Sequence, residues 1–163
     1  MNDDDGRNSI ALIVFSGDMD KIFAALTIAT GAAASGMKVS MFFTFWGLKL
    51  LQEKGSKRGK NDFLRRLFNV MVKPGPDKRP ISRMNMGGAG AAMMKKIMKK
   101  SKLPSLAEML TTAKSLDVKF TACSTSMNVM GIPKESLIPE VDSVAGVASF
   151  LAVAQESGTT LFI

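Results

Sequence analysis

The sequence predicts an α/β fold, a three-layer sandwich in which helices cover both faces of a five-stranded, mainly parallel sheet. Two observations favour this fold. Short apolar runs rich in β-branched and aromatic residues recur along the chain, and segments with helical periodicity alternate with them. With 163 residues, of which 46% are hydrophobic, the chain can bury one core of this kind. We therefore expect a single domain over residues 1–163.

The first fifty residues have the pattern of a βαβ unit. After an acidic start, the apolar run at residues 9–18 is typical of a strand buried on both faces that ends in a turn. Residues 19–37 place apolar side chains at three- and four-residue steps, which predicts a helix, and residues 38–47 form a second buried strand. The connection between these strands is expected to be right-handed.

Residues 48–102 form a basic helical insertion between the second and third strands, with 16 of the 22 Lys and Arg residues but only 3 of the 14 Asp and Glu residues. Residues 61–72 predict an amphipathic helix, and residues 73–80 predict a loop rich in helix breakers. Residues 84–100 predict a second helix with an apolar face and a basic face. The apolar face consists of Met93, Met94, Ile97 and Met98, and the basic face consists of Lys95, Lys96, Lys99 and Lys100.

The alternation of helices and strands resumes after residue 102. Residues 103–117 predict a helix with Ser105 near its start and Glu108 in its first turn, and the third strand ends at Cys123. A short helical segment follows from Ser124. Residues 135–146 then predict a fourth strand, residues 147–158 a helix, and residues 159–163 a closing strand.

The composition excludes several classes of protein. The chain contains no histidine, so Ser-His-Asp and Cys-His nucleophile systems and most catalytic zinc sites are excluded, and we expect no metal and no cofactor. A single cysteine cannot form a disulfide within the chain. No stretch approaches the ~20 apolar residues of a spanning helix, and the acidic start lacks the pattern of a secretory signal. These features predict a soluble protein of the cytoplasm.

Cys123 is expected at the place where open parallel sheets carry their sites. Ligands and reactive groups gather at the carboxyl ends of the strands, next to the point where the strand order reverses. For the order 2-1-3-4-5, found in flavodoxin-like sheets, this point lies between the first and third strands. Ser16 and Gly17, which follow the first strand, would then line the site together with Cys123 and Ser124.

The position of Cys123 at a helix start also bears on its reactivity. Backbone N–H groups and the positive end of a helix stabilise a thiolate, so they lower the pKa of the thiol without help from a histidine. The alternative is an inert, buried cysteine at the end of a strand. The residues alone leave both alternatives open.

The segment ACSTSMNVMGI at residues 122–132 resembles the A-C-x-x-S-M-x-x-M-G-I pattern of the DsrE/DsrF/DrsH-like superfamily. The resemblance is to its longer DsrE-like branch, often labelled as peroxiredoxin-family or putative sulfurtransferase proteins. Further matching segments are FFTFWGL at 42–48, MNMGGAG at 84–90, PSLAEML at 104–110, GVASFL at 146–151 and TLFI at 160–163. The sequence shows no resolving cysteine and no proline-threonine-cysteine motif, which argues against a peroxidase.

This resemblance implies a flavodoxin-like sandwich, assembly into a homo-oligomer, and a cysteine that carries sulfane sulfur as a persulfide. It also implies exchange of that sulfur with TusA-like carriers or rhodaneses. By motif match Cys123 is the sulfur carrier. Ser126, Met127 and Met130 match the same pattern and are expected to line the site.

Other functions find less support in the sequence. The segment Gly88-x-Gly90-x-x-Met93 lacks the third small residue of a dinucleotide-binding loop. The net charge of +8 would suit nucleic acid, but Phe63 and Phe68 fall on the buried face of their predicted helix, so we expect no nucleic-acid partner. Contact of the same basic and Met-rich faces with a membrane surface stays open as a subordinate alternative.

We therefore expect a sulfur-relay protein, with its status as a sulfurtransferase or as a carrier left open. The main alternative is a non-enzymatic adaptor that recruits an acidic protein partner through the basic, Met-rich helix at residues 84–100. In either case the four lysines of that helix are the expected docking residues.

Overall fold

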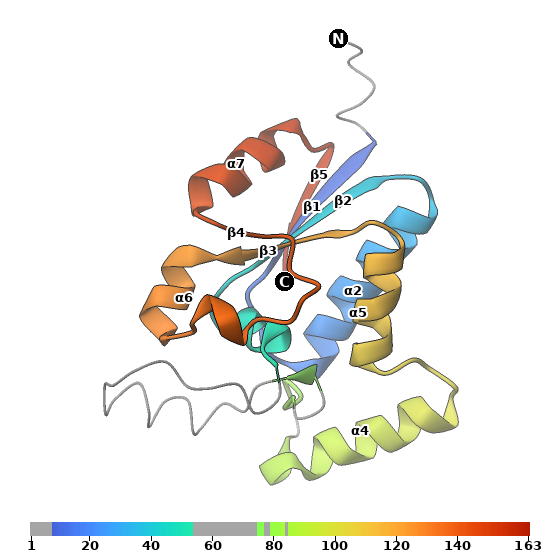
Figure 1. The fold of residues 1–163 in the computed structure, drawn as a ribbon. Helices are drawn as coiled ribbons and strands as arrows, with labels where there is room; N and C mark the ends of the chain where they lie inside the picture. Colours follow the sequence, from blue (N-terminus) through green and yellow to red (C-terminus); the bar gives the residue numbers. More distant parts are fainter. Residues whose placement is uncertain (1–7, 54–74, 77–78, 84) are drawn as a thin grey trace.

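The computed structural model describes residues 8–53, 75–76, 79–83 and 85–163. Five strands form one sheet in the order β4-β3-β2-β1-β5, and every pair of neighbouring strands is parallel (Figure 1). The strands are β1 (Ser9–Val14), β2 (Lys38–Phe43), β3 (Lys119–Cys123), β4 (Ser143–Ala145) and β5 (Thr159–Phe162).

Helices cover both faces of this sheet, which confirms the predicted three-layer α/β sandwich. Because successive side chains of a strand point to opposite faces, each central strand contributes side chains to two cores, one on each face of the sheet. Helices α2 (Met19–Ala34) and α5 (Leu106–Ser115) pack together over the larger core, and α7 (Val147–Glu156) covers the other face (Figure 1). The larger core receives, from the central strands, Ile10, Leu12, Val14, Val39, Met41, Phe43, Phe120 and Ala122.

The expected strand order 2-1-3-4-5 is wrong, because β2 lies between β1 and β3. In the expected order β2 would be an edge strand. Its run of Met41, Phe42 and Phe43 is fully buried in the sheet centre instead, while the edges are taken by the short and more exposed β4 and β5. Burial of the most apolar strands thus places β2 in the middle. The chain steps outward from β1 to β4, and only the connection through α7 returns to the far side of β1.

Two strands are shorter than their apolar patterns suggest. β2 ends at Phe43, and the chain turns into the 3₁₀ helix η1 (Phe45–Leu51), which packs tightly on β1. A Cβ on Gly47 would lie 2.2 Å from the carbonyl oxygen of Val14, so only glycine fits this contact. The leucines of η1 are fully buried, so the predicted basic insertion begins with core residues.

The fourth strand also differs from its prediction. Only Ser143–Ala145 pair with β3, while Lys134–Ser136 form a short 3₁₀ helix, η4. Pro139 lies inside the segment expected as strand, and a proline cannot donate to a sheet ladder. Helix α6 (Ser124–Met130), which precedes η4, ends at Gly131, and this glycine adopts the left-handed conformation that glycine favours at the end of a helix.

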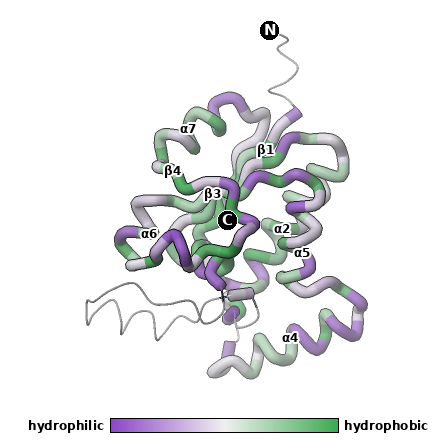
Figure 2. Tube along the Cα trace, in the orientation of Figure 1, coloured by the Kyte–Doolittle hydropathy of each residue, from purple (hydrophilic) through white to green (hydrophobic). Residues whose placement is uncertain are grey.

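The basic, Met-rich helix is present but shorter than the predicted range of residues 84–100. A 3₁₀ turn, η3 (Met86–Gly88), leads into α4 (Ala89–Lys100), which lies below the sheet and mixes hydrophobic and hydrophilic residues (Figures 1 and 2). Met94 and Met98 contact the core, but Met93 is 59% exposed and Ile97 50% exposed. Two of the four side chains of the apolar face therefore pack against the domain, and the other two are exposed.

The predicted start of the helix after residue 102 is confirmed. Helix α5 begins with a capping box in which Ser105 and Glu108 bond to each other's backbone N–H groups. The helix expected at residues 61–72, and most of the loop after it, lie outside the residues that the structure describes. Among the described helices, none has the length and apolar character needed to cross a bilayer.

Candidate functional site

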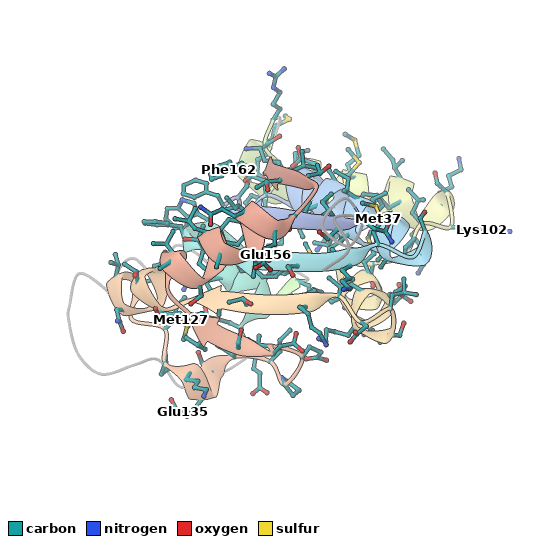
Figure 3. All side chains as sticks on the ribbon, turned by 90° about the horizontal axis from the view of Figure 1, so that it is seen from above. Met37, Lys102, Met127, Glu135, Glu156 and Phe162 are labelled. Carbon is teal, nitrogen blue, oxygen red and sulfur yellow. The ribbon has the colours of Figure 1, made fainter. Side chains whose placement is uncertain are left out.

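The candidate site lies at the carboxyl edge of the sheet, where β2 and β3 end side by side. Cys123 is the last residue of β3 and the N-cap of α6. Thr44 follows β2 directly, and its hydroxyl oxygen lies 2.7 Å from the hydroxyl oxygen of Ser126 on α6. In Figure 3, Met127 of the same helix lies at one end of the strands, and Met37 and Lys102 lie at the other end. The three polar side chains of the site thus come from two strand ends and one helix.

The side chain of Cys123 is buried beneath α7. It is only 5% exposed and belongs to a small apolar cluster with Ala11, Phe42 and Phe150. The rings of Phe42 and Phe150 stack with their centroids 4.9 Å apart, so α7 is held over the sheet next to the cysteine. The thiol therefore has an apolar cover on one side and the polar groups of α6 and Thr44 on the other.

These polar groups change the acidity of the thiol. Burial raises the pKa of Cys123, but the hydroxyl and N–H of Ser126, the hydroxyl of Thr44 and the N–H of Thr125 lower it, and the net pKa lies below that of an ordinary thiol. The sulfur makes no side-chain capping hydrogen bond of ordinary geometry to α6, so we attribute the effect to weaker contacts that strengthen once the sulfur is charged. The arrangement favours a thiolate without histidine.

The residues predicted on α6 lie in different surroundings. Ser126 is buried and faces the sulfur, whereas Ser124 is only partly exposed and lies near Gly146. Met127 and Met130 are buried in the larger core, so they anchor α6 to the domain.

Ser16 and Gly17 lie at the same edge of the sheet but do not adjoin Cys123. They follow β1, and β2 separates that strand from β3. Gly17 instead lies against Trp46 of η1 and the guanidinium group of Arg79. The four lysines of α4 are exposed. Lys102, two residues after this helix, lies at the opposite end of the strands from α6 (Figure 3).

Sequence reasoning missed Thr44 and Phe150 as parts of the site. Thr44 carried a signal, since it is the first polar residue after a buried apolar strand and belongs to the matching segment FFTFWGL. Phe150 belongs to the matching segment GVASFL, but its proximity to Cys123 could not be predicted, because it depends on α7 crossing back over the sheet.

Comparison with known proteins identifies the family. Residues 6–162 match the model of the DsrE/DsrF/DrsH-like family, which is nearly the whole chain. The chain belongs to this family. The resemblance seen in the sequence is thereby confirmed.

Two relatives of this DsrE-like chain align over almost their full lengths. The uncharacterized protein YrkE of Bacillus subtilis is 40% identical over 152 residues, covering 93% of this chain and 94% of the relative. The sulfur carrier protein DsrE2 of Allochromatium vinosum is 32% identical over 163 residues, covering 96% and 99%.

Solved structures support the fold of the DsrE-like chain. The ychN protein from E. coli has a TM-score of 0.53 at 11% identity, covering 96% of this chain and 99% of its own. MTH1491 from Methanobacterium thermoautotrophicum has a TM-score of 0.53 at 12% identity, covering 95% and 98%. At such low identity these likenesses bear on the fold alone.

Proposed function

We propose that this DsrE-like protein relays sulfane sulfur, carried as a persulfide on Cys123. The observation that carries the proposal is a single buried cysteine whose thiol pKa is lowered by the groups of Ser126, Thr44 and Thr125. Membership of the family and the likeness to a protein named as a sulfur carrier support the same function.

The chemistry requires a group that is both a nucleophile and a leaving group. In loading, the Cys123 thiolate attacks the outer sulfur of a donor R–S–SH; a new S–S bond forms, the donor's S–S bond breaks, and the donor leaves as R–S⁻. In release, an acceptor thiolate attacks the outer sulfur and Cys123 leaves as a thiolate. Groups that stabilise this thiolate make Cys123 a better leaving group, so they favour release as well as activation.

The partners follow from this chemistry. We propose that donor and acceptor are TusA-like or rhodanese-like sulfur carriers, or small persulfides, and that the protein acts in the cytoplasm as a homo-oligomer. The exposed apolar residues of α7 and β5 support assembly, since an interface between subunits would remove them from water. They are Val147, Leu151, Val153 and Phe162.

Intact mass measured after incubation with a sulfane-sulfur donor tests the proposal. We expect the protein to gain the mass of one sulfur atom, which reduction removes and Cys123→Ser abolishes. A matched control moves the thiol in the double variant Cys123→Ser, Ser115→Cys, because Ser115 is exposed near the end of α5. Equal loading of the relocated thiol, or no loading of the native protein by any donor, would contradict the proposal.

A second function is favoured by the exposed surface of α4, where Met93 and Ile97 lie beside the four lysines. A non-enzymatic adaptor would use this surface to bind an acidic partner. If Cys123→Ser leaves the activity of the protein intact and changing the lysines abolishes it, the adaptor function replaces the relay.

A further inference from the structure

Arg79 is a buried cation that the proposed relay chemistry does not use. Its side chain is only 2% exposed, and Nε and both Nη atoms lack a hydrogen-bond partner among the residues that the structure describes. Burial of a guanidinium group without hydrogen-bonding partners is strongly unfavourable, because the group loses its hydration and gains nothing in return. This arrangement therefore calls for an explanation.

The surroundings of Arg79 form a defined place in the fold, at the carboxyl end of β1 and the start of α2. Nη1 of Arg79 lies 3.5 Å from the position that a Cβ on Gly17 would occupy, and the same position is 3.1 Å from the Cβ of Trp46. The absence of a side chain at Gly17 thus lets the guanidinium group, η1 and the start of α2 approach one another closely.

The segment that carries Arg79 is fixed to the first turn of α2. The N–H of Met19 donates to the carbonyl oxygen of Pro80 at 2.7 Å, and the N–H of Ser82 donates to Oδ1 of Asp20 at 2.9 Å. Arg79 is therefore held against α2 by its neighbours along the chain, and its position does not depend on an ion pair of its own.

The nearby carboxylate of Asp18 only partly balances the charge. Burial lowers the pKa of Arg79 to about 10, although Asp18 raises it, so the group stays protonated at neutral pH. Oδ2 of Asp18 accepts a hydrogen bond from Ser16 at 3.1 Å and pairs with Lys21 at 3.2 Å. Asp18 is thus shared between several groups and Asp20 is bound by Ser82, so neither carboxylate accepts a hydrogen bond from the guanidinium group.

We propose that Arg79 and the N-terminal end of α2 form a binding site for a small oxyanion of the carboxylate or sulfate type. The planar fork of an arginine matches two oxygens of such an anion. The start of a helix favours negative charge, and α2 has no side-chain cap of its own. The site also lies at the carboxyl edge of the sheet, where open α/β folds bind ligands.

The position of this oxyanion site relative to Cys123 suggests two sources for the anion. One strand, β2, separates the two strand ends, so the sites are about 10 Å apart at ~4.8 Å per strand. The anion could be free and inorganic, or it could be the carboxylate of a small persulfide whose sulfur reaches Cys123. The second source rests on the proposed function, whereas binding of an oxyanion at Arg79 does not.

The first experiment uses Trp46, the only tryptophan, as a reporter beside the site. The full-length Cys123→Ser protein is titrated with potassium sulfate, with potassium acetate, and with potassium chloride at matched ionic strength. We expect a saturable change in Trp46 fluorescence and a rise in Tm with sulfate or acetate but not with chloride. Arg79→Met should weaken binding about tenfold or more, because a charge-assisted, bidentate contact is lost.

Further variants separate the site from general effects. Arg83→Met is the matched control, since Arg83 is exposed, and it should bind as the parent does. Gly17→Ala keeps Arg79 but crowds the space beside Nη1, so it should also weaken binding. No saturable response to sulfate or acetate in the parent, or the same response in Arg79→Met, would overturn the proposal.

The second experiment distinguishes the two sources in protein that retains Cys123. Loading rates are measured with cysteine persulfide and with the persulfide of cysteine methyl ester, which lacks the carboxylate. If Arg79→Met slows loading by the first donor but not by the second, the oxyanion belongs to the donor. If it slows neither yet abolishes sulfate binding, the site binds a free oxyanion. Sulfate binding in a protein that no donor loads would support the oxyanion site while refuting the proposed relay.

Discussion

The hydroxyl groups around Cys123 allow a quantitative test of how this chain activates a thiol without histidine. Ser126→Ala removes one hydroxyl that faces the sulfur, and Thr44→Val removes another while keeping the shape of the side chain. Both changes leave the apolar cover formed by Phe150 in place. Each should therefore raise the pKa of the Cys123 thiol, because burial continues to disfavour the charged form and fewer donors oppose it.

The size of the effect follows from the strength of the lost contact. Hydrogen bonds to charged groups contribute about 1.5–3 kcal/mol, and a weak acceptor such as sulfur favours the lower end of this range. A loss of about 1.4 kcal/mol reduces the thiolate population about tenfold at a pH below the pKa. Since the nucleophilicity of a thiolate rises with its pKa, with a Brønsted coefficient of about 0.4–0.5, we expect alkylation at a pH below the thiol pKa to slow only about threefold.

The two substitutions should not be additive, because the hydroxyls of Thr44 and Ser126 also contact each other at 2.7 Å. The assay is the pH dependence of alkylation by iodoacetamide, followed by intact mass, for both single variants and the double variant. Thr121→Val is the matched control, since the hydroxyl of Thr121 lies on β3, as Cys123 does, but contacts Ser143 and not the thiol. An unchanged pH midpoint in both Ser126→Ala and Thr44→Val would refute this account of the thiolate.

Three further predictions concern assembly, stability and docking. Leu151→Asp on exposed α7 should shift the protein to a smaller species in light scattering, whereas Leu116→Asp, also at an exposed leucine, should not; an unchanged mass for Leu151→Asp would place the interface elsewhere. Asp142→Asn should lower the free energy of unfolding by about 1 kcal/mol, since its carboxylate accepts from Lys114 at 2.6 Å and from the N–H of Phe120 at 2.7 Å. Because these contacts lower the pKa of Asp142 despite its partial burial, the difference from the parent should be present at neutral pH and vanish as acidification protonates the folded carboxyl; a pH-independent difference in chemical denaturation would contradict this. Sulfur transfer to an acidic carrier should slow with salt and with replacement of the basic face of α4 by Gln, while loading by a small donor stays unchanged, and equal slowing of both reactions would indicate a structural role. The replaced residues are Lys95, Lys96, Lys99 and Lys100.

The sequence by itself determined most of the helices and strands and pointed to the candidate residue Cys123, because these depend on local patterns. Short apolar runs predicted the strands and period-3.6 apolar spacing predicted the helices, and the pair of Ser105 and Glu108 marked the start of α5. The lone cysteine at a strand-to-helix junction, within a segment that resembles a family motif, identified the candidate site. Residues close in sequence decide such features, so no knowledge of the fold was needed.

Only the tertiary structure decided which strand ends meet and which side chains surround the thiol. The order of the sheet depends on which strands bury the most apolar surface, and this placed β2 between β1 and β3, bringing Thr44 to Ser126 and leaving Gly17 beside Arg79. The return of α7 across the sheet set Phe150 over Cys123. Burial of Arg79 is likewise invisible in the sequence, where it is one of many basic residues, because burial results from contacts between segments distant along the chain.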